Sequence, residues 1–188
     1  LALFLVRWQR GIEKIGFAFM MSVLIPAAYS TMIGLRDLYL HSGLHYVRSD
    51  GTLFLVLVLL GAWGTDVGGL LAGSLFGKHK LAPTISPKKT VEGALGGIVL
   101  CFAVLVYVNF WAKDAKISYA ALVVLSVLCA CGAMFGDLAA SAAKRSFHVK
   151  DFGNLIPGHG GILDRFDSVL LVSPILFIFL QIVPVIKR

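Results

Sequence analysis

The stretch that decides the fold is TLFLVLVLLGAWGTDVGGLLAG, residues 52–73. It contains a single charged side chain, Asp66. A helix needs about 20 predominantly apolar residues to cross the hydrocarbon core of a bilayer. The apolar residues here form a continuous run and do not alternate with polar ones, so the stretch predicts a transmembrane helix and not a strand of a membrane barrel.

Four other segments have a similar length and character. With the first, the predicted spans are 15–33, 52–73, 91–112, 117–140 and 166–186. Together they predict an all-α, polytopic transmembrane helical bundle with about five full spans. The chain starts at Leu1 inside a short apolar run, 1–6, which we interpret as the tail of an earlier helix. We therefore expect 1–188 to be a single transmembrane catalytic domain that lacks its N-terminal helices.

The composition supports this interpretation. The 188 residues are 58% hydrophobic and 14% charged, whereas a soluble domain has about 25% charged residues. The net charge of +7 would suggest nucleic acid for a soluble protein, but no nucleic-acid-binding motif is present. Basic residues in loops and a site for phosphates account for the charge more simply.

The Lys and Arg residues fall unevenly on the two sides that the five spans define. Eleven lie before the first span or in the loops 74–90 and 141–165, and six lie on the opposite side. Basic residues are enriched in cytoplasmic loops. This bias predicts that both loops face the cytoplasm, where they could form one site. The localisation that we expect is an integral protein of the bacterial inner membrane.

The most polar part of the chain is SAAKRSFHVKDFGNLIPGHGGILDRFD, residues 141–167. Lys144, Arg145, Lys150 and Arg165 lie among three carboxylates, two histidines and four glycines. A segment of this charge density between two apolar segments indicates chemistry on a charged substrate at a membrane.

Carboxylates lie before this stretch and at its C-terminal end. Asp137 precedes it late in the fourth span, and Asp164 and Asp167 lie at its end, at the start of the fifth span, three residues apart and so on one helix face. A helical hairpin would bring Asp137 and Asp164 together. Such oxygens suit Mg²⁺, which also binds substrate phosphates; helix-end electrostatics is the structural alternative for the second pair. For Asp66, a structural contact and a cation or proton site both remain open.

Two loops have features of phosphate sites. The glycines around His159, which include Gly160 and Gly161, permit close backbone approach to an anion and lead into a helix N-terminus. In the other loop, Ser86 followed by proline predicts an N-cap and the first residue of a helix. Lys88 and Lys89 would then flank a helix start and clamp a triphosphate.

These motifs resemble the signature of the phosphatidate cytidylyltransferases (CDP-diacylglycerol synthases). The matching positions in the polar stretch are Ser141, Lys144, Arg145, Lys150, Asp151, Gly153, Pro157, His159, Gly160, Gly161, Asp164, Arg165 and Asp167. Those in the other loop are Phe76, Gly77, Lys78, Ser86, Pro87, Lys88, Lys89, Thr90, Glu92 and Gly93. The resemblance extends from about Asp66 to the C-terminus.

The resemblance implies a membrane enzyme, often a homodimer, that uses CTP and phosphatidic acid to make CDP-diacylglycerol and pyrophosphate. It implies Asp137 and Asp164 as ligands of Mg²⁺, with Asp167 completing the cluster and a second ion such as K⁺ nearby. We assign phosphate binding to Lys144 and Arg145 together with the two lysines of the other loop. The expected substrate-binding set is Ser86, Lys88, Lys89, Thr90, Ser141, Lys150, His159, Gly160, Gly161 and Arg165.

Two other functions fit part of the pattern. Intramembrane Asp66 and Asp137 could line the path of an ion-coupled transporter, although such a protein does not need the pattern of 141–167. A CTP-dependent transferase or kinase acting on another lipid would need the same headgroup site.

Overall fold

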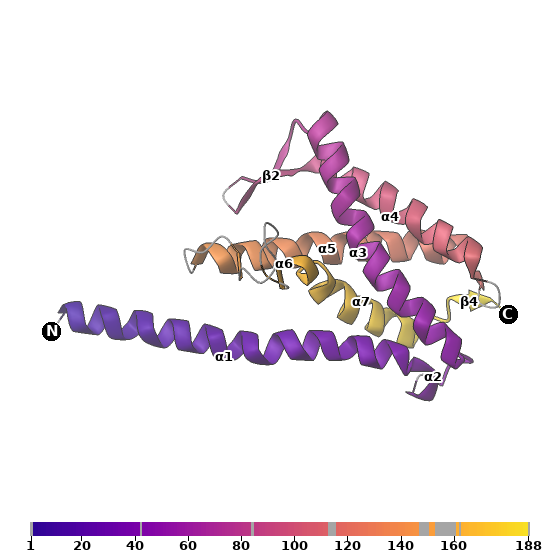
Figure 1. Ribbon diagram of the computed structural model, residues 1–188, viewed down its shortest axis with the longest axis horizontal. Helices are drawn as coiled ribbons and strands as arrows, with labels where there is room; N and C mark the ends of the chain where they lie inside the picture. The colour runs from indigo at the N-terminus through magenta and orange to yellow at the C-terminus, as the bar shows by residue number, and fades with distance from the viewer. Residues whose placement is uncertain are drawn as a thin grey trace.

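In the computed structural model, the described residues are 2–41, 43–83, 85–112, 116–146, 151–152, 161 and 163–187. For 2–14, 16–18, 20, 41, 165 and 187 the backbone alone is described. Within these ranges the chain forms seven helices and two small two-stranded sheets (Figure 1). The all-α bundle that the sequence predicts is confirmed.

The helices occupy most of the chain. They are α1 Ala2–Arg36, α2 Leu38–His41, α3 Arg48–Phe76, α4 Val91–Trp111, α5 Tyr119–Ser146, α6 Leu163–Phe166 and α7 Val169–Ile182. The antiparallel sheets pair β1 (Lys80–Ala82) with β2 (Ser86–Thr90) and β3 (Lys116–Ile117) with β4 (Ile186–Lys187). The two sheets lie at opposite ends of α4 (Figure 1).

Three of the five predicted spans are helices long and apolar enough to cross a bilayer in the part of the chain that the structure describes: α3, α4 and α5. The first predicted span lies inside the longer helix α1, which contains Pro26. The fifth corresponds to α7, an apolar helix of only 14 residues with Pro174 inside it. The protein is therefore an integral membrane protein by the length and composition of its helices.

The interpretation of 1–6 as the tail of a separate helix is wrong for the residues that are described. Helix α1 is continuous from Ala2 to Arg36. The polar segment at 7–14 contains arginine, glutamine, glutamate and lysine, which are all good helix formers, and no proline. A cluster of charges ends an apolar run in the sequence, but it does not end a helix.

Helices α3 and α4 cross with their backbones in near contact. A Cβ atom built on Gly68 would lie 2.6 Å from the carbonyl oxygen of Gly96 and 2.7 Å from Cβ of Leu100. Small residues permit this close approach between membrane helices. The contact brings the C-terminal half of α3, which carries Asp66, beside the start of α4.

The remaining helices pack around a core of aliphatic side chains. The largest fully buried members are Leu35, Leu38, Phe54, Leu57, Leu105, Leu122, Leu125, Leu176 and Leu180. Cys101 and Cys129 are buried here as free thiols, as expected for small apolar side chains. Large apolar side chains such as Leu95 and Val99 are instead exposed on α4, which fits a surface that faces lipid.

The loop after α3 differs from the prediction. Ser86 does not cap a helix and Pro87 does not begin one, because both belong to strand β2. The cap is Thr90, whose Oγ1 accepts a hydrogen bond from the backbone N–H of Gly93 at 3.1 Å. Proline is tolerated in a strand that lies at a sheet edge, so the Ser-Pro pair fits the hairpin as well as it fits a helix start.

Candidate active site

A cavity of about 680 Å³ opens where α3, the β1–β2 hairpin, α4, α5 and α6 meet. We call it the polar pocket. Its charged and hydroxyl-bearing lining residues are Thr65, Asp66, Ser74, Lys80, Ser86, Lys88, Lys89, Thr90, Asp137, Lys144, Asp151, Asp164 and Asp167. Segments 70 residues and more apart in the sequence therefore contribute to one site, as the two-loop prediction requires.

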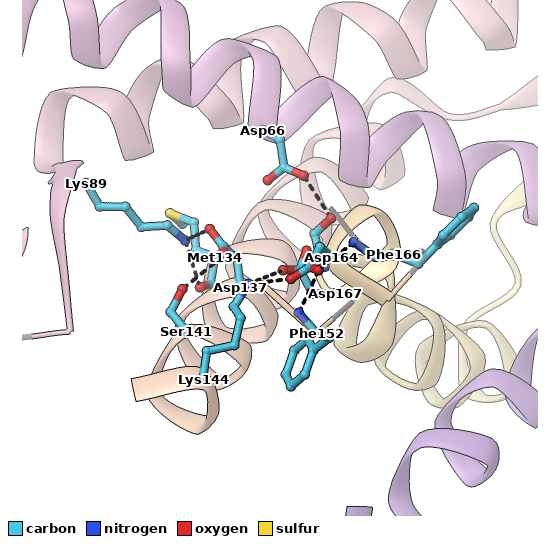
Figure 2. A network of polar contacts seen from close by, with 12 residues as sticks. Asp66, Lys89, Met134, Asp137, Ser141, Lys144, Phe152, Asp164, Phe166 and Asp167 are labelled. Carbon is cyan, nitrogen blue, oxygen red and sulfur yellow. Dashed lines mark hydrogen bonds and ion pairs between the residues drawn. The ribbon is translucent and has the colours of Figure 1, made fainter. Parts of the chain in front are cut away.

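Lys89 links the hairpin to α5. Its Nζ lies 2.6 Å from Oδ2 of Asp137 and donates a hydrogen bond to the carbonyl oxygen of Met134 at 3.3 Å. Ser141 Oγ lies one turn further along α5 and donates to Oδ1 of Asp137 at 3.4 Å. Figure 2 shows Lys89 extending across the pocket toward Asp137. A basic loop residue and an intramembrane carboxylate thus neutralise each other.

Lys144 and Asp164 form a nearly buried ion pair. Lys144 Nζ lies 2.8 Å from Oδ1 of Asp164, and the two side chains are 13% and 7% exposed. Oδ2 of Asp164 accepts hydrogen bonds from the backbone N–H groups of Phe152, at 2.9 Å, and Gly161, at 3.0 Å. Burial opposes ionisation, but the bonds from Lys144 and these two amides together lower the pKa of Asp164 below its usual value. Asp164 is therefore a carboxylate at neutral pH.

Asp167 has a different environment. Its Oδ2 lies 3.8 Å from Lys144 Nζ, and its Oδ1 accepts a hydrogen bond from the backbone N–H of Ser168 at 2.9 Å. Burial, followed by repulsion from Asp137, raises the pKa of Asp167 to about 6. The pocket lining contains five aspartates and four lysines, so it carries slightly more carboxylates than ammonium groups.

The sequence predicts that Asp164 and Asp167 lie in the first turn of one long helix, but the structure differs. Asp164 lies in the four-residue helix α6, and Asp167 lies in a turn before α7. Both still approach Lys144 (Figure 2). Tyr29 of α1, which sequence reasoning missed, supports this break because its hydroxyl donates to the carbonyl oxygen of Phe166 at 2.8 Å.

Comparison with known proteins assigns the chain to a family. Residues 1–183 match the cytidylyltransferase family. The chain belongs to that family. It is 40% identical over 171 residues to a phosphatidate cytidylyltransferase of Staphylococcus saprophyticus, covering 90% of this chain and 63% of the relative. A phosphatidate cytidylyltransferase of Bacillus subtilis is 39% identical over 170 residues, covering 90% of this chain and 60% of the relative.

The chain thus spans a little over three-fifths of the length of the curated relatives that it matches. The family resemblance of the two motif loops is confirmed by these matches, which include both loops within residues 1–183. The polar and charged side chains that the sequence analysis singled out in the two motif regions and that line the polar pocket are Ser86, Lys88, Lys89, Thr90, Asp137, Lys144, Asp151, Asp164 and Asp167.

Asp66 also lines the polar pocket. Its Oδ2 accepts a hydrogen bond from Ser168 Oγ at 2.8 Å, which links α3 to the turn before α7. Figure 2 shows Asp66 above the other carboxylates, pointing toward them from α3. Asp66 therefore makes a structural contact and lies in the lining of the pocket; its role as a cation or proton site stays a prediction.

The other predicted site residues have varied positions. Arg145 is exposed on α5 and is not among the described residues that line the polar pocket. The N–H of Gly161 bonds to Asp164. Lys150, His159 and Gly160 lie outside the described residues, as does the side chain of Arg165.

The donor set of the pocket fits a hard divalent cation. Asp66, Asp137, Asp151, Asp164 and Asp167 provide carboxylate oxygens, which are the ligands that Mg²⁺ prefers. Within the described ranges, no three acidic, histidine or cysteine side chains are gathered closely around a common point. Lysine ammonium groups lie between the carboxylates instead. Lys89 and Lys144 each hold one of these carboxylates, Asp137 and Asp164 respectively.

Proposed function

We propose that the protein transfers CMP from CTP to phosphatidic acid and releases pyrophosphate, giving CDP-diacylglycerol for phospholipid synthesis. The observation that carries this proposal is the pairing of Lys89 with Asp137 and of Lys144 with Asp164 in one pocket. The names of the relatives supply the substrates. Because the chain spans only part of those relatives, the activity is proposed for the protein as a whole.

The chemistry needs little base catalysis. A phosphate oxygen of phosphatidic acid is already an anionic nucleophile, and it attacks the α-phosphorus of CTP. A new P–O bond forms there, and the bond to the bridging oxygen of the leaving pyrophosphate breaks. The main obstacle is repulsion between two polyanions, so the ammonium groups of Lys88, Lys89 and Lys144 stabilise the charge that develops on the leaving group.

Mg²⁺ would be held by Asp137, Asp164 and Asp167, with K⁺ as a candidate second ion. When bound, it would neutralise phosphate charge and orient the triphosphate. The chain's own contribution is to keep Asp164 ionised through its two backbone hydrogen bonds and to fix the helix break with Tyr29. Ser141 would orient the carboxylate of Asp137.

The membrane placement follows from the same argument. We propose that the hairpin and the polar stretch face the cytoplasm, where CTP is found, in a bacterial inner membrane. Leu70 and Leu81 line the pocket and are 70% and 39% exposed. They offer an apolar border past which a lipid phosphate could enter while its acyl chains remain in the bilayer. A homodimer is consistent with the family resemblance and remains part of this proposal.

The test is a transfer assay with the full-length protein purified in detergent. Radiolabelled CTP, phosphatidic acid and Mg²⁺ should yield labelled CDP-diacylglycerol, and EDTA should abolish the product. In parallel reactions, diacylglycerol or another lipid phosphate replaces phosphatidic acid as the acceptor. Transfer to one of these and none to phosphatidic acid would reject the proposed substrate, and folded protein without any nucleotide transfer would reject the proposed reaction.

A further inference from the structure

The β1–β2 hairpin carries much of the polar pocket but has little support of its own. Lys80, Ser86, Lys88 and Lys89 all line the pocket. Strands of three and five residues form the hairpin, and a two-stranded hairpin is marginally stable in water by itself. Figure 1 shows it projecting from the ends of α3 and α4. Something must hold its base in place if its lysines are to meet a substrate.

Glu92 provides that support. Its Oε2 accepts hydrogen bonds from the backbone N–H groups of Lys78, at 3.1 Å, and His79, at 3.2 Å. Its Oε1 lies 2.6 Å from Nδ1 of His79. One side chain at the start of α4 thus binds the chain 13 and 14 residues earlier, where it leaves α3 to enter β1.

Two neighbouring contacts also hold the base of the hairpin. Val91 donates its backbone N–H to the carbonyl oxygen of His79 at 2.9 Å. Gly77 packs against the side chain of Thr90, since a Cβ atom at Gly77 would lie 2.8 Å from Cγ2 of Thr90. Both ends of the hairpin are therefore joined at one place, and Glu92 is the side chain that makes three of the polar contacts there.

Glu92 does not attract the proposed ligand electrostatically, because its charge has the same sign as that of a phosphate. It is the only acidic residue between Asp66 and Asp114, in a segment with lysines at 78, 80, 88 and 89. A carboxylate here opposes the approach of a polyanion. A carboxylate at a helix N-terminus is favourable in general, but that effect does not require the side chain to turn back and bind Lys78 and His79. Glu92 is also not among the described residues that line the polar pocket.

We propose that Glu92 is a positioning residue that holds the base of the hairpin so that Lys88 and Lys89 meet the phosphates of the nucleotide. This inference rests on the proposed function for the identity of the ligand. It does not make Glu92 a catalytic residue, since it acts through the backbone at 78–79.

The experiment compares Glu92→Ala and Glu92→Gln with the wild-type protein and with Asp37→Asn as a matched control. Asp37 is a carboxylate at the end of α1 with similar exposure, 27% against 25%, and it pairs with Arg36 at the opposite end of α3. Two readouts are used in detergent: hydrogen–deuterium exchange of the hairpin amides, and the KM and kcat for CTP.

Removing the hydrogen bonds should speed exchange at 78–90 by about tenfold or more, with α5 unchanged. The KM for CTP should rise about tenfold while kcat changes less. Glu92→Gln keeps one acceptor oxygen and should fall between wild type and Glu92→Ala, and Asp37→Asn should match wild type in both readouts.

Three results for Glu92→Ala would overturn the inference. The first is unchanged hydrogen–deuterium exchange in the hairpin. The second is equally faster exchange in α5, which indicates global unfolding, and the third is faster hairpin exchange with an unchanged KM for CTP. If the wild-type protein transfers no nucleotide, the proposed function fails separately. In that case CTP binding, measured by equilibrium dialysis, replaces KM as the second readout, and unchanged binding in Glu92→Ala would still overturn the role of Glu92.

Discussion

At the scale of single residues, the polar pocket depends on ion pairs that cross between elements. Asp164 is the most fully bound of its carboxylates, with one lysine and two backbone amides on its oxygens. Asp137 and Asp167 each have fewer partners. The sequence pointed to all three, because aspartates beside a basic, glycine-rich segment are typical of phosphate chemistry.

We expect Asp164→Asn to lower turnover in the transfer assay by about a hundredfold or more, because the substitution removes a charged ligand and the partner of Lys144. Asp37→Asn serves as the control and should retain wild-type activity. Thermal unfolding of both variants checks that they are folded. Activity of Asp164→Asn within a few fold of wild type would contradict the assignment.

The raised pKa of Asp167, about 6 against an ordinary 3.8, predicts a pH-dependent stability. The folded state binds the proton more tightly than the unfolded state does. The favourable contribution is therefore complete below the unfolded pKa and is lost as the pH rises through about 6. In EDTA, Asp167→Asn should have a Tm a few degrees above wild type at pH 7. The difference should vanish near pH 4, and a lower Tm for the variant at pH 7 would contradict this account.

At the scale of elements, long apolar runs predicted α3, α4 and α5 well, because a membrane helix satisfies its own backbone hydrogen bonds and its signal is local. The hairpin was not predicted. A Ser-Pro pair fits both a helix start and an edge strand, and the choice depends on contacts of residues 78–79 with Glu92. The break between α6 and α7 was also missed, since its support comes from Tyr29, more than 130 residues away.

The close crossing of α3 and α4 gives a prediction with a built-in control. Gly68→Ala places a methyl group 2.6 Å from the backbone of Gly96, whereas Gly69→Ala meets nothing nearer than 3.6 Å. Overpacking of this kind costs about 1–3 kcal/mol. The first variant should unfold at a lower temperature in detergent and the second should behave as wild type. Equal Tm values for the two variants would show that the helices do not cross this closely.

At the scale of the whole molecule, helix α3 separates two ends with different chemistry. The polar pocket lies along its C-terminal half, the hairpin follows its C-terminal end, and Val47 lies at its N-terminal end. The excess of basic residues on the pocket side predicts that this side faces the cytoplasm. The exposed apolar side chains between the two ends would face lipid.

This orientation can be tested by labelling with a membrane-impermeant maleimide in bacterial spheroplasts. Val47→Cys, at a position 43% exposed, should react in intact spheroplasts. Lys80→Cys, at an exposed hairpin position, should react only after permeabilisation. The wild-type protein, with its three native cysteines, gives the background. The reverse labelling pattern would place the pocket on the outer side.

The sequence by itself determined the membrane class, the main helices and most of the charged residues of the site, because hydrophobic run length and local motifs do not depend on distant contacts. Only the tertiary structure decided which side chains meet. The pairing of Lys89 with Asp137, the hydrogen bond from Ser168 to Asp66 and the support of α6 by Tyr29 join residues far apart in the chain. Such contacts arise from the packing of complete helices, and no spacing along the sequence encodes them.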